Sequence, residues 1–320
     1  MRAAVIRRFG GPEVFEVETV PEPGAGPGES LVDVTMSGVN FGDLHHRTGD
    51  LDPRLSLPAV LGVEAVGVRR RDGRRVAALL RRGGGYAEVA AAPDTHIVLV
   101  PDGVDDLQAA ALLEQGCTAY GALTAAGRFH AGERVAVTAA AGGVGHLAVQ
   151  IARAGGAGRL VGTGSTAAKR EFVRSLGADV VLDPSLSDLS GALRDAACGG
   201  VDLVVDTVGG PLLRAALGAL APFGRVVSVG ARSSEPDVLS VVEDLAVPSI
   251  GVFGFWMRHV VDDRARYGRV AGAVFDLALR GELVAAIDRV VALTGIGAAH
   301  AAIAARETIG KVLVDVRRPE

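Results

Sequence analysis

The chain has 320 residues, enough for about two ordinary domains, and 49% of them are hydrophobic while 22% are charged, as in a globular protein. The formal net charge of −4 gives no electrostatic basis for binding nucleic acid or an anionic membrane surface. No apolar run reaches the roughly 18 to 20 residues that span a bilayer, and the apolar stretch at residues 3–6 is too short for a signal peptide.

Cysteine and arginine usage narrows the expectations further. Cys117 and Cys198 are too few for a disulfide framework, so we expect a reducing, cytoplasmic environment. Two cysteines also cannot supply the clustered thiolates of a structural zinc site, and we expect no metal. The densest basic segment, residues 69–82, is interrupted by Asp72 and several glycines, which is typical of a solvated hairpin or loop rather than of a nucleic-acid site.

The first hundred residues contain short apolar runs separated by clusters of glycine, proline and aspartate, a pattern typical of a compact barrel-like or sandwich domain. The predicted strands span residues 3–6, 31–34, 59–68, 76–80, 86–91 and 97–100. A helix is predicted over residues 105–126.

From Glu133 onward, strands and helices alternate. Strands are predicted at residues 134–138, 159–163, 178–182, 201–205, 225–229 and 249–253. Helices are predicted at 145–154 and 167–176, and others begin at Asp188 and Pro211. This alternation, with strands that are apolar throughout, predicts an α/β fold with a doubly wound parallel sheet covered by helices on both faces. Mixed helical and strand pieces follow from residue 265 and end in a strand at residues 311–316.

A glycine-rich turn joins the first of these strands to the first helix. Residues 139–145, Ala-Ala-Ala-Gly-Gly-Val-Gly, fit the dinucleotide fingerprint with Ala140, Gly142 and Gly145 at its key positions and with Gly143 and Val144 between them. We expect Gly142 to let the backbone approach a pyrophosphate and Gly145 to let the helix pack closely on the strand. Amides at the helix N-terminus would receive the anion. A tight turn without a ligand is the alternative.

The end of the second strand indicates which dinucleotide is bound. An NAD site usually places an acid there for the ribose hydroxyls. This chain instead has Gly164, Ser165, Thr166 and Lys169, with no acid before Glu171, and lysine is rare, occurring only at positions 169 and 311. Hydroxyls with a cation suit a 2′-phosphate, which favours NADPH. The alternative is that Ser165 or Thr166 caps a helix and Lys169 is solvated, although capping is compatible with phosphate binding.

Taken with this turn, other segments resemble the quinone oxidoreductase (zeta-crystallin-like), zinc-independent branch of the medium-chain dehydrogenase/reductase superfamily. The similarity covers essentially the whole chain. Two segments together are specific to this branch: Asn-Phe-x-Asp at residues 40–43 and the turn Ala-Ala-Gly-Gly-Val-Gly at residues 140–145. The further landmarks lie at residues 38–43, 61–67, 73–76, 84–88, 117–120 and 310–312.

The resemblance implies a GroES-like catalytic domain, residues 1–118, completed by residues 256–320 around an inserted NADPH-binding Rossmann domain, residues 119–255. It implies a site in the cleft between the domains and, commonly, a homodimer. Asn40 and Asp43 would line the nicotinamide and substrate pocket, although both could instead hold a turn. The remaining cofactor residues that it implies are Thr118, Lys169, Gly230, Val252, Phe253, Gly254 and Lys311.

The sequence departs from the family pattern in three places. The tyrosines that often follow Asn-Phe-x-Asp are replaced by His45 and Leu51, and the link between residues 67 and 76 is short, which predicts a more open cleft rim. The aromatic segment 251–257 is unusual in a chain with 4% aromatic residues. Core packing is the common fate of such a segment, but its expected position also suits a flat, hydrophobic substrate. The predicted substrate-pocket residues are Phe41, Leu51, Phe255 and Trp256.

These observations predict a zinc-independent reductase of small, hydrophobic, electron-poor acceptors. Quinones and α,β-unsaturated carbonyls need mainly placement near the nicotinamide, because they are already electrophilic. His45 or His46 could supply the proton, although paired histidines on a loop are often merely exposed and water could serve instead. Two alternatives remain: a biosynthetic enzyme that reduces an enone or catalyses a cyclisation on this fold, and a protein that binds NADPH without turnover.

Overall fold

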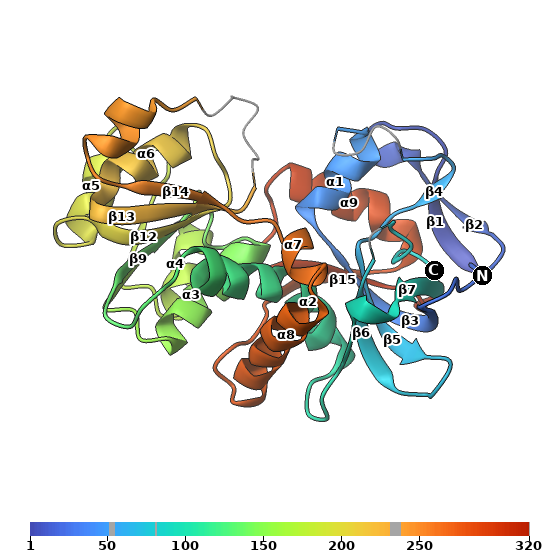
Figure 1. Ribbon diagram of the computed structural model, residues 1–320. Helices are drawn as coiled ribbons and strands as arrows, with labels where there is room; N and C mark the ends of the chain where they lie inside the picture. The colour runs from blue at the N-terminus through green and yellow to red at the C-terminus, as the bar shows by residue number, and fades with distance from the viewer. Residues whose placement is uncertain (51–54, 81, 231–237, 320) are drawn as a thin grey trace. The chain divides into compact units, whose positions relative to one another are not determined.

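The computed structural model describes residues 1–50, 55–80, 82–230 and 238–319, and the chain divides into two compact units (Figure 1). Unit 1 comprises Met1–Gln115, His259–Arg280 and Val284–Glu320, and unit 2 comprises Gly116–Arg258 and Gly281–Leu283. The domain limits expected from the sequence, after residues 118 and 255, are close to the unit boundaries after residues 115 and 258.

Unit 1 contains two sheets that share one apolar core. The smaller sheet has the antiparallel order β2-β1-β4, formed by β1 (Arg2–Ile6), β2 (Phe15–Thr19) and β4 (Ala59–Val60). The larger has the order β15-β16-β3-β5-β6-β8, with β7 also paired to β3. Its strands are β3 (Glu29–Val39), β5 (Glu64–Arg69), β6 (Arg75–Leu79), β7 (Val89–Pro93), β8 (Ile97–Leu99), β15 (Ile287–Val291) and β16 (Lys311–Asp315). Buried aliphatic side chains from both sheets form a single cluster, as a β-rich domain requires.

The helices of unit 1 connect and flank these sheets. They are α1 (Phe41–Thr48), α8 (Arg264–Leu279) and α9 (Ile296–Ala304), with 3-10 turns η1 (Pro12–Val14), η2 (Asp94–His96) and η5 (Leu293–Gly295). Two helices cross the unit boundaries, α2 (Asp106–Gly121) and α7 (Arg258–Val261).

Helix α1 corrects the expectation of a loop around the paired histidines. A capping box formed by Asn40 and Asp43 begins the helix, and Gly49, with a left-handed φ of 83°, ends it. The strand expected over residues 59–68 is also interrupted, because Gly62 has a φ of 94°. A Cβ at Gly62 would lie 2.7 Å from the Tyr86 ring, so only glycine suits this turn.

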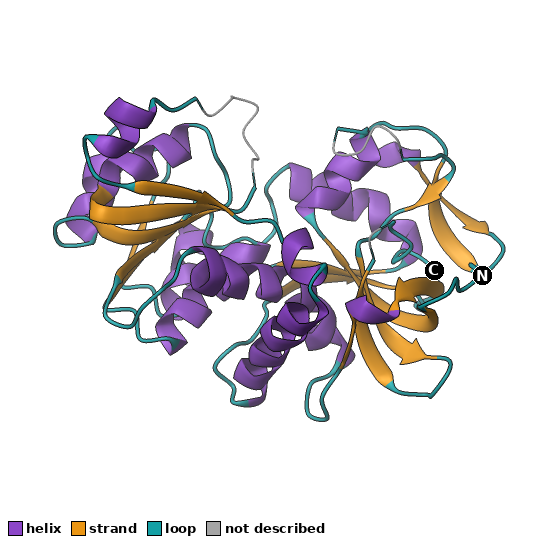
Figure 2. Cartoon of the chain, in the orientation of Figure 1, coloured by secondary structure: helices purple, strands orange, loops and turns teal. Residues whose placement is uncertain are grey.

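Unit 2 is a doubly wound parallel sheet, as predicted, with the order β11-β10-β9-β12-β13-β14. The strands are β9 (Arg134–Val137), β10 (Arg159–Thr163), β11 (Val180–Leu182), β12 (Val201–Asp206), β13 (Leu220–Ser228) and β14 (Gly251–Gly254). The helices are α3 (Gly143–Ala154), α4 (Ala167–Ser175), α5 (Leu189–Ala196) and α6 (Pro211–Ala219), with π-helical turns η3 (Ala122–Ala126) and η4 (Val241–Ala246). Helices cover both faces of this sheet, α3 and α4 on one and α5 and α6 on the other (Figures 1 and 2). The strand order reverses between β9 and β12, the position at which such sheets bind ligands.

Arg81 of the basic segment lies outside the described residues. Residues 70–74 form the turn of the β5–β6 hairpin, as predicted, and four arginines between positions 69 and 75 pair with carboxylates. The pairs are Arg69 with Asp72, Arg70 with Asp33 and Glu22, Arg71 with Asp94, and Arg75 with Asp106. Among the described residues, every helix is too short or too polar to span a membrane.

Candidate functional site

The turn between β9 and α3 has the close packing expected of a dinucleotide fingerprint. A Cβ at Gly145 would collide with the carbonyl oxygen of Ala139 and would lie 2.8 Å from the Cα of Ala140. Helix α3 therefore begins directly against the strand end, as predicted for Gly145. Gly142 is the N-cap of α3 and has no side chain to cover the first-turn amides, so these can face an anion. Ala140 is fully buried, and its amide donates to Thr163 at 3.0 Å.

A buried carboxylate links this turn to the loop after β12. Asp206 accepts a hydrogen bond from the hydroxyl of Thr138 at 2.6 Å and another from the amide of Gly209 at 2.9 Å. The amide of Thr207 also donates to the hydroxyl of Thr138 at 3.0 Å. Sequence reasoning did not single out Asp206, although an acid that ends an apolar strand needs such partners. These bonds fix the two loops at the switch point of the sheet.

The segment after β10 combines a helix N-cap with a cation. Thr166 caps α4 by accepting a hydrogen bond from the amide of Lys169 at 3.2 Å, while Ser165 is exposed. Arg170 donates to the carbonyl of Gly164 at 2.8 Å and to Asp183 at 2.7 Å. Lys169 is half-buried at the first turn of α4. The arrangement fits a 2′-phosphate, because a cation and two hydroxyls follow the strand where an NAD site would carry an acid.

The other predicted cofactor residues of unit 2 differ in exposure. Thr118 is buried in α2, and Val252 is half-buried in β14. Phe253 and Gly254 are exposed at the end of the same strand. Gly230, also exposed, follows β13 directly before the segment 231–237, which lies outside the described residues.

In unit 1, Asn40 and Asp43 lie at the start of α1. Asp43 is fully buried, and its Oδ2 accepts hydrogen bonds from the Asn40 amide at 2.8 Å and from the Tyr86 hydroxyl at 3.0 Å. The Tyr86 hydroxyl also lies 3.4 Å from Nε2 of His300. The ring of His300 meets the Phe15 ring edge-on, and the two ring centroids are 4.7 Å apart. A buried polar cluster thus joins α1, the segment before β7, and α9.

Burial shifts the titration of this cluster strongly. It raises the pKa of Asp43 to about 6, although the Asn40 amide, the Tyr86 hydroxyl and the charge of Lys311 oppose the change. Burial, together with the neighbouring Asp43 charge, raises the pKa of Tyr86 well above its ordinary value. Burial also lowers the pKa of His300 to about 3, and the positive charge of Arg47 adds to the effect. The neutral forms of these groups are therefore favoured by the fold.

A second enclosed cluster holds the carboxamide of Asn40. Nζ of Lys311 donates to Oε1 of Glu64 at 2.6 Å and to Oδ1 of Asn40 at 2.7 Å, and Nδ2 of Asn40 donates to Oε1 of Glu64 at 2.8 Å. The Glu64 and Lys311 side chains have 0% exposure. Lys311, which was expected among the cofactor residues, is thus a fully buried partner of Glu64 and Asn40.

The predicted proton donors and the described pocket residues are half-buried or exposed. His45 and His46, half-buried, are in the last turn of α1, and Nδ1 of His45 is 3.7 Å from Asp50. The Phe41 ring packs edge-on against His45 at 5.2 Å. Phe255 covers Gly121, where a Cβ would meet its ring, and Trp256 is 57% exposed. Leu51 lies outside the described residues.

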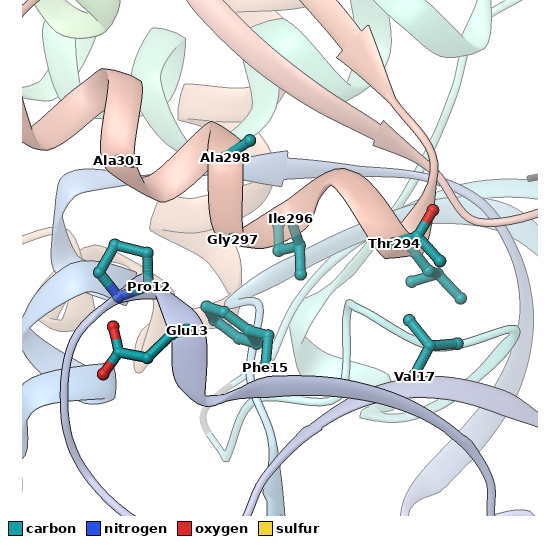
Figure 3. A pocket seen from close by; sticks show the side chains of 10 residues that line it. Pro12, Glu13, Phe15, Val17, Thr294, Ile296, Gly297, Ala298 and Ala301 are labelled. Carbon is teal, nitrogen blue, oxygen red and sulfur yellow. The ribbon is translucent and has the colours of Figure 1, made fainter.

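A surface groove of about 390 Å³ also lies in unit 1, within the size range of small-molecule sites. Pro12, Phe15 and Val17 line one side and Thr294 and Ile296 the other (Figure 3). Its lining, in the part of the chain that the structure describes, includes none of the predicted site residues.

Sequence reasoning missed Glu64, Tyr86 and His300 as members of the site. Two of them carried a signal. Glu64 is a single acid within an apolar strand, and His300 is a single polar side chain within the apolar helix α9. Charged and polar groups in such settings need buried partners. Tyr86 had no comparable signal. Within the described ranges, no three histidine, cysteine, aspartate or glutamate side chains are grouped as a metal site would need.

Comparison with known proteins finds the same two parts in described families. Residues 26–102 match the alcohol dehydrogenase GroES-like domain, and residues 143–274 match the zinc-binding dehydrogenase family. The chain is similar to a 2-haloacrylate reductase from a Burkholderia species, at 33% identity over 98% of each chain. It is also similar to a quinone oxidoreductase from Pseudomonas aeruginosa, at 33% identity over 96% of this chain and 97% of the relative. The crystal structure of Escherichia coli quinone oxidoreductase complexed with NADPH matches with a TM-score of 0.91 and 27% identity, covering 98% of this chain and 100% of that one.

Proposed function

The chain belongs to the zinc-independent quinone oxidoreductase branch of the medium-chain dehydrogenase/reductase superfamily, and on that premise we propose that it is an NADPH-dependent reductase of quinones or α,β-unsaturated carbonyl compounds. Two features carry the proposal. The turn at residues 139–145 packs closely at Gly145, and the segment after the second strand of the sheet has Lys169 where an NAD site would have an acid. Both features suit a phosphorylated dinucleotide.

Different residues of unit 2 would hold the pyrophosphate and the 2′-phosphate of the cofactor. The first-turn amides of α3 and the backbone at Gly142 would receive the pyrophosphate, because the helix dipole and uncapped N–H groups favour an anion there. Lys169, with the hydroxyls of Ser165 and Thr166, would receive the 2′-phosphate. When bound, NADPH supplies a hydride to the acceptor.

The residues of unit 1 would orient the acceptor and stabilise its reduced form. Asn40 offers a carboxamide that two charged partners hold in place. Asp43, with a pKa of about 6, and Tyr86 form a hydrogen-bonded pair behind it. Acceptors that are electrophilic without a metal match this set, because it offers hydrogen-bond donors rather than a Lewis acid. Two relatives support the acceptor class, since one is named for quinones and the other for 2-haloacrylate.

We further propose that the protein is cytoplasmic and forms homodimers through unit 2. The low cysteine count supports a reducing compartment. Strand β14 lies at the edge of the described sheet, and several exposed apolar side chains accompany it, which supports a partner at this edge.

The cofactor part of the proposal is tested by titrating the purified protein with NADPH and NADH. We expect Lys169→Ala to weaken NADPH binding by about 10-fold or more and to leave NADH binding unchanged, because only NADPH carries the 2′-phosphate. Arg174→Ala, which removes an exposed cation paired with Glu171 on the same helix, is the matched control. Equal affinity of the wild type for NADH would contradict the choice of cofactor.

Turnover is tested by following NADPH absorbance with a panel of quinones and enones. Oxidation of NADPH with any of them supports a reductase and identifies the acceptor class. Tight NADPH binding without turnover on the whole panel would contradict the reductase proposal and favour a protein that binds the cofactor for another purpose.

A further inference from the structure

Three segments far apart in the sequence meet around the carboxamide of Asn40. They are the end of β3, the start of β5 and the start of β16, which lie in one sheet. Their meeting point is crowded, because a Cβ at Gly38 would collide with Glu64 and would lie 2.5 Å from Cε and 2.7 Å from Nζ of Lys311. Gly38 therefore leaves the space that the Glu64–Lys311 ion pair occupies.

This ion pair is difficult to explain by stability alone. Both side chains are fully enclosed, and replacing a buried ion pair by apolar side chains is often neutral or stabilising. Asn40, in contrast, keeps 6% of its surface exposed, whereas the Glu64 and Lys311 side chains have none exposed. The pair is thus placed to act through Asn40 rather than directly.

The two charges permit a single orientation of the Asn40 amide. Oδ1 accepts from the Lys311 ammonium at 2.7 Å, and Nδ2 donates to the Glu64 carboxylate at 2.8 Å. A flipped amide would set its donor against the ammonium and its acceptor against the carboxylate. Glu64 is itself held, since its other oxygen accepts from the amide of Glu114 at 3.0 Å.

We propose that Glu64 and Lys311 are positioning residues that present the remaining Nδ2 hydrogen of Asn40 to the carbonyl oxygen of the acceptor. This inference rests on the proposed reductase function. In reduction of an enone, a hydride from NADPH forms a C–H bond at the β-carbon, and the electrons of the C=C bond move so that the oxygen becomes an enolate. A proton from solvent water then adds at the α-carbon and the carbonyl re-forms, so that the acceptor gains one hydride and one proton while NADPH becomes NADP⁺.

An amide N–H fixed before reaction suits this developing charge. A preorganised donor stabilises an oxyanion more than a mobile one, because it needs no reorganisation as charge builds up. The Lys311 ammonium also polarises the amide through Oδ1, which strengthens the N–H as a donor.

The test is a set of kinetic comparisons with NADPH and the acceptor on which the wild type is active. The double variant Glu64→Gln/Lys311→Met removes both charges together, so no unpaired charge stays buried. We expect its kcat to fall about 10-fold or more while the Kd for NADPH changes by less than about 2-fold. Asn40→Ala is expected to lower kcat on the order of 100-fold, and adding Glu64→Gln/Lys311→Met to it should cause no further fall, since the pair acts through Asn40.

A second variant keeps every charge. Gly38→Ala pushes the ion pair out of place and should lower kcat in the same direction, whereas Gly272→Ala on α8, where a Cβ meets nothing within 4 Å, is the matched control. A wild-type kcat in both the double variant and Gly38→Ala, or losses that multiply with that of Asn40→Ala, would overturn the positioning role. A wild type inactive on every acceptor would instead overturn the proposed function.

Discussion

Asp43 is a buried acid, and its surroundings favour the protonated, neutral form. Its Oδ1 has no hydrogen-bond partner among the described residues, while its Oδ2 accepts two hydrogen bonds. Burial is the largest cause of its pKa of about 6. In the unfolded chain the same group titrates near 3.8. Between these values the native state holds a proton that the unfolded state has lost, so the contribution of Asp43 to stability falls as pH rises from about 4 to about 6.

We predict that Asp43→Asn removes this pH dependence. The free energy of unfolding of the variant minus that of the wild type should increase by about 3 kcal/mol from pH 4 to pH 7, because the pKa of Asp43 is shifted by roughly two units. Asparagine can still accept from the Asn40 amide and the Tyr86 hydroxyl, so the local contacts are retained. Urea unfolding followed by circular dichroism at several pH values measures the difference. Parallel curves for the two proteins would contradict the prediction.

His300 has the opposite sign. Burial, and then the charge of Arg47, lowers its pKa from 6.5 to about 3. The unfolded chain therefore binds a proton that the native state excludes, and stability is lost as pH falls from about 6.5 toward 3. The shift corresponds to a loss on the order of 5 kcal/mol.

We predict that His300→Leu makes the protein more resistant to acid. Leucine keeps an apolar contact with Phe15 and leaves the bond from Tyr86 to Asp43 in place. The midpoint of acid unfolding should move to lower pH in the variant. Replacing the exposed His259 by Gln removes one histidine without changing the buried cluster, so it should leave the midpoint where it is. A midpoint shared by all three proteins would count against the buried histidine as the cause.

At the scale of elements, Gly145, which has no side chain, lets α3 begin close to the end of β9. A Cβ at Gly145 meets backbone on the strand side, whereas one at Gly142 meets only the carbonyl oxygen of Ala139, at 3.2 Å. The first collision cannot be relieved by rotating a side chain. The second needs a shift of a few tenths of an ångström.

We predict that Gly145→Ala lowers both stability and cofactor affinity. The start of α3 must move away from the strand, which costs about 1 to 3 kcal/mol in overpacking and displaces the phosphate-binding amides. NADPH affinity should fall about 10-fold or more, and Tm should fall as well. Gly142→Ala should weaken NADPH binding with a smaller change in Tm, because its Cβ occupies space beside the amides rather than the helix–strand contact. Equal Tm values for the two variants would contradict this account.

The sheet of unit 2 could be predicted because its information is local. Each strand is an apolar run next to a helix, and a parallel sheet buried on both faces needs no more than that. Strands β2 and β15 were not predicted, because Phe-Glu-Val-Glu-Thr and Ile-Asp-Arg-Val-Val carry charges and lie at sheet edges, where pairing alone defines the strand. Helix α1 was missed because its eight residues are largely polar and depend on a cap at each end.

The candidate site divides in the same way. The phosphate turn and the segment around Lys169 are contiguous and could be found in the sequence. The cluster of Asp43, Tyr86 and His300 could not, because its hydrogen bonds join positions 43 and 214 residues apart. Pairing of Glu64 with Lys311 lay between these cases. Each of these two residues begins a strand and is followed by apolar residues, which indicates that its charge would need a buried partner, but only the sheet order shows that the two meet.

At the scale of the whole molecule, several large apolar side chains are exposed at one edge of unit 2. Strand β14 pairs with β13 and ends the described sheet. Phe223 of β13 is 85% exposed, and Val241 and Val247, in the segment before β14, are 72% and 70% exposed. The amide of Phe223 donates to the carbonyl of Ser249 at 2.7 Å, so the exposed ring is held beside this edge. An edge strand with apolar neighbours favours association with a second copy.

We predict that the wild type sediments as a dimer and that Phe223→Asp combined with Val247→Asp converts it to a monomer. Two buried carboxylates at a self-complementary contact would be unpaired in both copies, which should raise the dissociation constant by about 100-fold or more. Aspartate suits position 223 in the folded monomer, because the φ of 66° there is a left-handed conformation that acids tolerate better than large aromatic residues. Leu186→Asp is the matched control, since Leu186 is 45% exposed and follows β11 at the opposite edge of the same sheet. Sedimentation velocity across a concentration series measures each constant. A monomeric wild type, or a control that dissociates as readily as the double variant, would show that this edge is not the interface.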